Sequence, residues 1–267
     1  MGALVSRLFA ATHDALSVES EAAVLGAVRR ELLRSASGRV VEVGAGTGEN
    51  LGHYAALAAE AAAASGDAGD GDKAATAATT AGGCGLGGAP PAPYTRLVLV
   101  EPNPHMRARL HARVDGLRDR RLAAGVEVVD AALPALPFAD ASFDTVVLFL
   151  VLCSVPDVPA AVAEARRLLA PGGRVLLVEH LAAKQPAIAA RQARWEWLWR
   201  ILFDGCRLCR ETLDMVAAGG FDVGGVAERS WRLNAFDDLW LARLGVGIVT
   251  LRGDGGEGGT EGVMAAA

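Results

Sequence analysis

Apolar and polar positions along the chain form short apolar runs that alternate with longer segments of helical spacing or composition. The apolar runs lie at 39–43, 96–100, 125–130, 143–150 and 174–179. Such an alternation is typical of a mostly parallel sheet that is covered by helices on both faces. The pattern therefore predicts an α/β fold with a doubly wound sheet.

The remaining regular segments extend this prediction. Two further runs, at 221–230 and 246–251, bring the predicted sheet to seven strands. Helices are expected where apolar residues recur every three or four positions, or where the composition favours a helix, at 19–34, 49–60, 104–122, 157–170, 187–203 and 211–218.

Two stretches lack the large apolar residues that a core needs. Residues 61–93 are almost wholly Ala, Gly, Asp, Thr and Pro, and the tail is rich in glycine. Such segments cannot offset the entropy of ordering by burial, so we expect them to be disordered. The expected organisation is an N-terminal helical segment at 1–37, one domain at 38–252 with the low-complexity insertion at about 61–93, and a disordered tail at 253–267.

Composition and charge exclude several classes of function. The 267 residues carry a formal net charge of -5, whereas proteins that bind nucleic acids usually carry a basic excess. No apolar run reaches the roughly 20 residues that a membrane-spanning helix needs. We expect neither a nucleic-acid partner nor a transmembrane segment, and we interpret one arginine-rich helix as a solvated face. Its arginines are Arg107, Arg109, Arg113, Arg118, Arg120 and Arg121.

The cysteines indicate a reducing compartment, such as the cytoplasm or an organellar stroma or matrix. Four of them, Cys84, Cys153, Cys206 and Cys209, are too few for a disulfide scaffold in this chain. Cys206 and Cys209 form a CxxC pair, which can indicate a redox or zinc site. No second pair accompanies it, so we expect no metal site, and a disulfide between these two cysteines stays an open alternative.

The most informative stretch is VVEVGAGTGENLGHY, at 40–54. Gly44, Gly46 and Gly48 follow a predicted strand and open a helix, so backbone N–H groups can approach a ligand without obstruction by a Cβ atom. The spacing is GxGxG, not the GxGxxG of dinucleotide-binding loops. Glu42 places a carboxylate beside the loop, which disfavours a diphosphate and suits a cationic ligand.

A second carboxylate, Glu101, ends the strand at 96–100. An acidic side chain at this place in a doubly wound sheet can accept hydrogen bonds from the two hydroxyls of a ribose. The structural alternative is an acid at a helix N-terminus, which the flanking Pro102 and Pro104 make weaker. Together with the glycine loop, Glu101 favours S-adenosylmethionine over NAD as the cofactor.

Five segments carry a resemblance to a known family: VEVGAGTGENLGHY, LVEPNPHM, ALPFADASFDTVVLFLVLCSVPD, EARRLLAPGGRVLLVEHLAA and LFDGCRLCRETLDMV. Together they resemble class I S-adenosylmethionine-dependent methyltransferases and, more narrowly, the methyltransferase-like protein 7 family. The resemblance covers about 22–251 apart from the insertion. It implies methyl transfer, with small alkyl thiols as the substrates of the best understood animal relatives. Those relatives are anchored by an N-terminal apolar segment, which we do not expect here because the chain begins close to the domain.

The resemblance also implies a set of cofactor-binding positions. Glu42 would lie near the ammonium of the methionine moiety, and Glu101 takes the ribose position, where the family more often has Asp. Pro134 stands where the family has an adenine-contacting acid, and Asp130 is only a doubtful substitute. The positions expected to bind the cofactor are Glu42, Gly44, Ala45, Gly46, Gly48, Glu101, Pro102, Asn103, Met106, Ala132, Leu133, Leu150, Val151 and Cys153.

No catalytic residue is assigned from the sequence. A thiol acceptor reacts as its thiolate, and His180 and Asp204 are weak candidates for the base that would deprotonate it. We expect Cys153 to be a small buried hydrophobe rather than a nucleophile.

An aromatic helix at 191–203 holds three of the five tryptophans, and Trp195, Trp199 and Leu202 are predicted to share one of its faces. The helix either packs over the sheet edge or forms an apolar lid over the substrate cavity that touches a membrane surface. Two alternatives to thiol methylation stay open because fold does not determine substrate. They are C- or O-methylation of a quinone-like or phenolic small molecule, and S-adenosylmethionine binding without catalysis.

Overall fold

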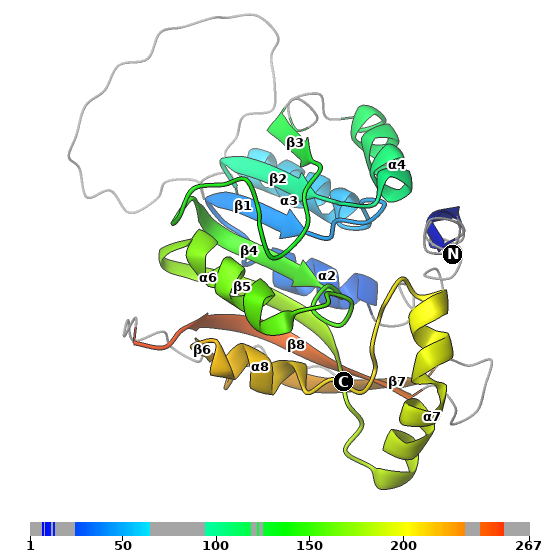
Figure 1. The fold of residues 1–267 in the computed structure, drawn as a ribbon. Coiled ribbons are helices and arrows are strands. Elements are labelled where there is room, and N and C mark those ends of the chain that lie inside the picture. The colour runs from blue at the N-terminus through cyan, green and yellow to red at the C-terminus, as the bar shows by residue number, and fades with distance from the viewer. Residues whose placement is uncertain are drawn as a thin grey trace, which may run out of the picture.

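The computed structural model describes residues 25–64, 94–118, 122, 125–232 and 241–253, together with residues 7, 9–11 and 13. One sheet organises these residues (Figure 1), and its strands follow the order β3-β2-β1-β4-β5-β8-β6, with β7 also paired to β8. Strands β1 to β5 run parallel, and β8 runs antiparallel to β5, β6 and β7. The predicted doubly wound, mostly parallel α/β sheet is confirmed. The strands are β1 (Arg39–Val43), β2 (Arg96–Val100), β3 (Val126–Val129), β4 (Phe143–Phe149), β5 (Leu169–Leu181), β6 (Phe221–Asp222), β7 (Ala227–Arg232) and β8 (Leu241–Leu251).

The predicted number of seven strands was wrong, because the sheet has eight in the described part of the chain. The run predicted at 221–230 is divided into β6 and β7 by a turn, in which the N–H of Val226 donates to the carbonyl of Val223 over 3.0 Å. Two glycines between these residues let the backbone leave the sheet. β5 also begins earlier than predicted, at Leu169, and its pairing with β4 shifts register between Phe143 and Thr145.

The helices connect these strands much as predicted, with different ends. α3 includes 61–64, the first four residues of the predicted insertion, because alanine is the strongest helix former. α4 ends before Gly116, its C-cap, and not near Leu122. The remainder of the insertion, 65–93, and the tail at 254–267 lie outside the described residues. The helices are α2 (Gly26–Leu33), α3 (Leu51–Ala64), α4 (Pro104–Asp115), α6 (Val158–Leu168), α7 (Pro186–Leu202) and α8 (Thr212–Ala218).

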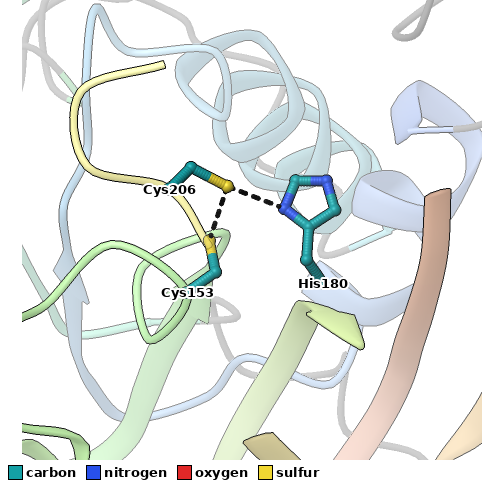
Figure 2. Close-up of side chains that lie close together, drawn as sticks. All are labelled: Cys153, His180 and Cys206. Atoms are coloured by element: carbon teal, nitrogen blue, oxygen red, sulfur yellow. Dashed lines mark hydrogen bonds between the residues drawn. The ribbon is translucent and has the colours of Figure 1, made fainter. Parts of the chain in front are cut away.

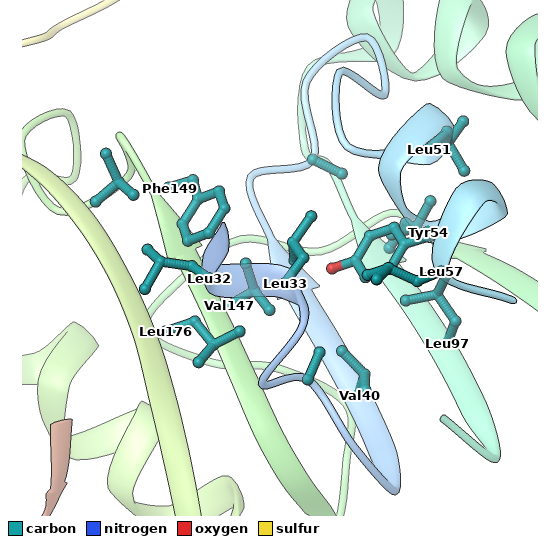
Figure 3. Packing of buried hydrophobic residues seen from close by; sticks show 14 of the residues in the cluster. Leu32, Leu33, Val40, Leu51, Tyr54, Leu57, Leu97, Val147, Phe149 and Leu176 are labelled. Carbon is teal, nitrogen blue, oxygen red and sulfur yellow. The ribbon is translucent and has the colours of Figure 1, made fainter. Parts of the chain in front are cut away.

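Two hydrophobic clusters cover the two faces of the sheet. Along β1, Val40 belongs to the first cluster and Val41 to the second, as the two-residue period of a strand requires. The first cluster packs α2, α3 and α4 against the sheet, with Leu33 and Tyr54 at its centre (Figure 3). The second cluster packs α6 and α8 on the opposite face. Burial on both faces explains why the central strand at 143–149 is almost continuously apolar.

The topology brings the predicted site to one edge of the sheet. Because β1, β2, β4 and β5 run parallel, their carboxyl ends meet there, and with them Gly44, Glu101, Leu150 and His180. Open α/β sheets bind ligands beyond this edge, at the point where the strand order reverses. That point lies between β1 and β4 in this chain. Among the described helices, none is both long enough and apolar enough to cross a bilayer.

Candidate cofactor and acceptor site

The loop after β1 holds three glycines with positive φ, +69° at Gly44, +59° at Gly46 and +92° at Gly48. A Cβ atom at Gly44 would lie 2.8 Å from Val151 Cγ2, and a Cβ atom at Gly48 would lie 2.8 Å from methyl groups of two leucines. A Cβ atom at Gly46 would meet no described atom within 4 Å. Gly44 and Gly48 are therefore needed for packing within the protein, whereas Gly46 faces open space at the ligand-binding edge.

The base of this loop is fixed to the neighbouring strand. The N–H groups of Gly44 and Ala45 donate to the carbonyl of Val100 over 2.8 and 3.0 Å. Ala45 is itself buried. The loop therefore reaches the ligand edge with its backbone held in place.

Glu42 lies under the glycine loop with an exposed fraction of 4%. Its Oε1 accepts a 3.0 Å hydrogen bond from Asn50, whose own oxygen accepts one of 3.1 Å from Arg29. Its Oε2 has no hydrogen bond of good geometry to a described residue, and the buried hydroxyl of Tyr54, which also lacks one, lies near enough to lower the pKa of Glu42. Burial raises the pKa of Glu42 to about 7, against the opposing effects of Tyr54, Arg29 and Asn50. A buried carboxylate oxygen with only a poorly aligned neighbour is costly, so a cationic ligand group would be stabilised beside it.

Glu101 is buried at the end of β2 and joins two loops. Its Oε2 accepts the N–H of Gly46 over 2.8 Å, and its Oε1 accepts the N–H of Asn103 over 2.8 Å. Burial raises the pKa of Glu101, these two hydrogen bonds oppose the rise, and the charge of Asp204 adds to it. Asp204 is thus close enough to interact electrostatically with the predicted ribose position.

The residues after Glu101 have structural roles of their own. The side-chain oxygen of Asn103 caps α4 by accepting two N–H groups of the first turn, over 3.0 and 3.4 Å. Met106 is buried and Pro102 is exposed. Asp130 forms a two-pronged ion pair with Arg107, over 2.8 and 2.7 Å. Its carboxylate is therefore engaged by the protein, which keeps it a doubtful adenine contact.

The loop after β3 was expected to contact the adenine through its backbone. Ala132 is exposed there and forms an isolated bridge with Ala135, and Leu133 is half-buried. The contact of these two residues with the adenine stays a prediction.

The segment after β4 is positioned by Glu179, which the sequence reasoning missed. This carboxylate, wholly buried in β5, accepts the N–H groups of Val151, Leu152 and Cys153 over 2.8, 2.7 and 3.1 Å. Burial raises the pKa of Glu179 to about 7, and the three hydrogen bonds oppose this rise. A signal was present in the run VLLVEHL, since a buried acid within a strand must find donors. Leu150, just before these residues, has a φ of +62°, which is rare for a side chain of its size.

Cys153 lies beside His180 and Cys206 (Figure 2). The sulfur of Cys206 is 3.5 Å from that of Cys153 and 3.3 Å from His180 Nδ1, and all three residues are buried. The contact with Cys206, followed by burial, raises the pKa of Cys153 well above its usual value. A thiol held in its protonated form is a poor nucleophile.

The CxxC pair does not converge on one site. Whereas Cys206 faces Cys153, the N–H of Cys209 donates to Glu196 over 3.2 Å. Burial and the neighbouring Glu196 raise the pKa of Cys209 to about 11. All three described cysteines are free thiols, and Cys84 lies outside the described residues.

α7 covers this sulfur-rich corner with one aromatic residue and exposes others. Trp199 is buried and stacks on Phe203, with ring centroids 3.9 Å apart, in a cluster with Cys153 and Cys206. Of the three residues predicted to share a face, only Trp199 is buried. The exposed apolar residues of the helix are Trp195, Trp197, Ile201 and Leu202, with exposed fractions of 37%, 60%, 48% and 51%.

The described residues fit S-adenosylmethionine in two respects. The open space at Gly46 lets a ligand approach the loop backbone, and the incompletely satisfied Oε2 of Glu42 suits an ammonium group. Lone pairs of Glu101 remain for a ribose, because each carboxylate oxygen can accept more than one hydrogen bond. The two carboxylates therefore match the ammonium group and the ribose hydroxyls of the cofactor.

Known proteins that are similar in sequence to this chain include methyltransferases. A family model described as a methyltransferase domain matches residues 80–177. The chain is 32% identical over 151 residues to the thiol S-methyltransferase TMT1A of Homo sapiens, covering 52% of this chain and 57% of that protein. It is 37% identical over 76 residues to the ubiquinone/menaquinone biosynthesis C-methyltransferase UbiE of Brucella anthropi, covering 28% and 29%. The chain thus spans little more than half the length of the human relative.

Solved structures agree on the fold. An S-adenosylmethionine-dependent methyltransferase from Methanosarcina mazei superposes with a TM-score of 0.53 at 13% identity, covering 80% of this chain and 92% of that one. The predicted resemblance to class I methyltransferases and to the thiol S-methyltransferases is confirmed. Residues 80–177 match a methyltransferase domain, which supports the expected cofactor, S-adenosylmethionine.

Proposed function

We propose that the protein transfers the methyl group of S-adenosylmethionine to the sulfur of a small or lipophilic thiol. The observation that carries the proposal is the arrangement at the sheet edge. The open cradle at Gly46 and the carboxylates of Glu42 and Glu101 lie at the same edge of the sheet as a hydrophobic cluster that includes Cys153 and Cys206. The similarity to TMT1A supports a thiol as the acceptor.

Three groups of this chain would hold the cofactor. Glu42 would accept hydrogen bonds from its ammonium, the Gly46 backbone would pack against it, and Glu101 would accept its ribose hydroxyls. When bound, the cofactor supplies an activated methyl group on a sulfonium.

The protein would act mainly by alignment and exclusion of water. Holding two reactants in line can contribute on the order of 7–11 kcal/mol to the lowering of a barrier. Glu179 would serve this end by fixing the segment from Val151 to Cys153, and Trp199 by covering it. His180 and Asp204 stay candidates for deprotonating the acceptor, and neither is assigned as a dedicated base.

The test is transfer of a labelled methyl group from S-adenosylmethionine to a panel of alkyl thiols, phenols and quinols of matched size. We expect labelled thioethers and little labelled ether or C-methylated quinol. The similarity to UbiE favours C-methylation of a quinol as the second candidate, and label on a quinol carbon would support it. Cofactor binding with no turnover on any acceptor would support a non-catalytic binding module.

The exposed face of α7 supports a peripheral contact with membranes that hold lipophilic acceptors. Trp197 and Ile201 are exposed beside Arg194 and Arg200, a combination that suits an anionic lipid surface. The protein should cosediment with anionic phospholipid vesicles more than with neutral ones, and the double variant Trp197→Gln/Ile201→Gln should not. Equal sedimentation of variant and parent would exclude this contact.

A further inference from the structure

Cys153, His180 and Cys206 meet at the ligand-binding edge although they come from three separate segments (Figure 2). Cys153 follows β4, His180 lies near the end of β5, and Cys206 lies in the loop after α7. Their exposed fractions are 1%, 8% and 5%, and their ligand atoms all lie within 4.8 Å of one another. Two sulfurs and an imidazole nitrogen form a soft donor set, which favours zinc over magnesium or calcium.

Two of the three separations are close to the edges of a tetrahedral zinc site, and the third is at most 4.8 Å. Zn–S bonds of about 2.3 Å and Zn–N bonds of about 2.0–2.1 Å set S–S edges of about 3.8 Å and S–N edges of about 3.5 Å. The observed S–S distance is 3.5 Å and the observed S–N distance from Cys206 is 3.3 Å. Small side-chain adjustments would therefore seat the ion.

The backbone around the three side chains is fixed by hydrogen bonds. The N–H of Arg207 donates to the carbonyl of Cys153 over 2.9 Å, and the hydroxyl of Thr212 donates to the carbonyl of His180 over 3.1 Å. Glu179 holds the N–H of Cys153 over 3.1 Å. Because both oxygens of Glu179 already accept backbone N–H groups, the described residues offer three ligands at this point.

We propose that the protein binds one Zn²⁺ through Cys153, His180 and Cys206, and that the thiol acceptor occupies the fourth position as a thiolate. Three protein ligands and one open position are the arrangement of catalytic zinc sites. The identity of the fourth ligand rests on the proposed function, whereas the three protein ligands do not. In this arrangement His180 is a zinc ligand and not the base that deprotonates the acceptor.

Zinc coordination and methyl transfer each leave every proton and electron pair accounted for. On coordination the two cysteine thiols and the acceptor thiol each lose one proton to the solvent, and each sulfur forms one bond to zinc. The acceptor sulfur then forms a bond to the methyl carbon as the methyl–sulfonium bond breaks, and that electron pair stays on the cofactor sulfur. The neutral thioether is a weaker ligand than a thiolate, so the product leaves.

The experiment uses the full chain, reduced and stripped of metal, and then titrated with Co²⁺ as a spectroscopic substitute for Zn²⁺. We expect visible bands of tetrahedral Co²⁺, a near-ultraviolet sulfur-to-cobalt band, and displacement of cobalt by one Zn²⁺ per chain. Cys206→Ser and His180→Gln should each lower zinc affinity by more than about 100-fold, beyond the loss typical of an outer-shell change. Cys209→Ser is the matched control, since Cys209 shares the CxxC motif and lies outside the cluster, and it should bind zinc as the parent does.

Circular dichroism identifies any variant that fails to fold. If one of Cys206→Ser and His180→Gln does not fold, the other still tests the site. A parent chain that shows no sulfur-to-cobalt band and retains no zinc overturns the proposal. Addition of an alkyl thiol should strengthen the band, and an unchanged spectrum would overturn the assignment of the fourth position. Zinc binding without thiol methylation would leave the metal site standing and contradict the proposed function. Full thiol methylation by a chain that binds no zinc would support the proposed function and overturn the metal site.

Discussion

The N–H of Gly46 donates a 2.8 Å hydrogen bond to Oε2 of Glu101 and so joins the ends of β1 and β2 at the ligand edge. The other carboxylate oxygen accepts the N–H of Asn103 over 2.8 Å. With an exposed fraction of 6%, Glu101 therefore shapes the glycine loop as well as offering lone pairs to a ligand.

Glu101→Gln should weaken cofactor binding and the fold together. Hydrogen bonds to a charged acceptor contribute about 1.5–3 kcal/mol, against about 1 kcal/mol for neutral ones, so affinity should fall about tenfold. The amide NH₂ would also face one of the two N–H groups, which should lower the free energy of unfolding by about 1–3 kcal/mol. Calorimetric titration and denaturant unfolding measure the two effects.

The matched control for this variant is Glu127→Gln. Glu127 forms a 2.7 Å ion pair with Arg96 on the exposed part of the sheet, and exposed pairs of this kind contribute little. Both quantities should stay close to those of the parent. Parental cofactor affinity in Glu101→Gln would remove Glu101 from the ribose position.

Glu42 predicts a pH dependence of stability. Burial raises its pKa to about 7 from an ordinary value of 4.5. A carboxyl group with a raised pKa contributes its full stability below the unfolded value and loses it as the pH rises through the folded value. The free energy of unfolding of the cofactor-free protein should therefore decline between about pH 5 and about pH 8, by up to about 3 kcal/mol from this group. Glu42→Gln should remove that part of the decline, which unfolding curves at several pH values would detect.

Cofactor binding should depend on pH in the opposite sense. A cationic ammonium favours the ionised form of Glu42, so affinity should rise as the pH approaches about 7. Near pH 6, binding should release a proton from Glu42, and calorimetry in buffers of different ionisation enthalpy counts it. In Glu42→Gln any proton released on binding comes from the ligand alone, because the amide does not titrate. The same proton release in the variant and the parent would therefore contradict the assignment.

Gly44→Ala and Gly46→Ala form a matched pair. Both positions have positive φ, +69° and +59°, so the two variants share a strain of about 1–2 kcal/mol. Only the Cβ atom at Gly44 would also lie 2.8 Å from a methyl group of Val151. We expect Gly44→Ala to have the lower melting temperature, and Gly46→Ala to retain more stability and lose cofactor affinity. Undiminished affinity in Gly46→Ala would place the ligand elsewhere.

Deletion of residues 65–93, with a short Gly-Ser linker between Ala64 and Tyr94, should change little. The returning chain is already held because the hydroxyl of Tyr94 donates to the carbonyl of Tyr54 over 2.8 Å. Loop-closure entropy varies by only about 0.6 kcal/mol for each doubling of loop length. Melting temperature and cofactor affinity should stay near the parental values, and a loss of soluble folded protein would show that the segment has a structural role.

Local patterns predicted much of the fold and of the glycine loop. β1 at 39–43 and β2 at 96–100 match their predicted bounds, because apolar periodicity and turn residues are properties of adjacent positions. The break between β6 and β7 was missed because the strand resumes after only four residues, two of which are glycines.

The sulfur cluster could not be predicted in the same way. The CxxC motif draws attention to Cys206 and Cys209, but sequence spacing in a loop does not determine side-chain direction. The loop after α7 turns Cys206 toward Cys153, which lies 53 positions earlier, and it brings the backbone of Cys209 to Glu196. The role of Glu179 could not be predicted for a related reason. Its partners are backbone N–H groups, which every residue except proline has.

The most direct measurement is the fate of the labelled methyl group when a lipophilic alkyl thiol and a quinol of matched size compete for it. The purified protein should place the label on sulfur, as a thioether, and Gly46→Ala should abolish this transfer while remaining folded. Label on the quinol with the thiol unchanged, or thioether formation at the parental rate in Gly46→Ala, would contradict these expectations.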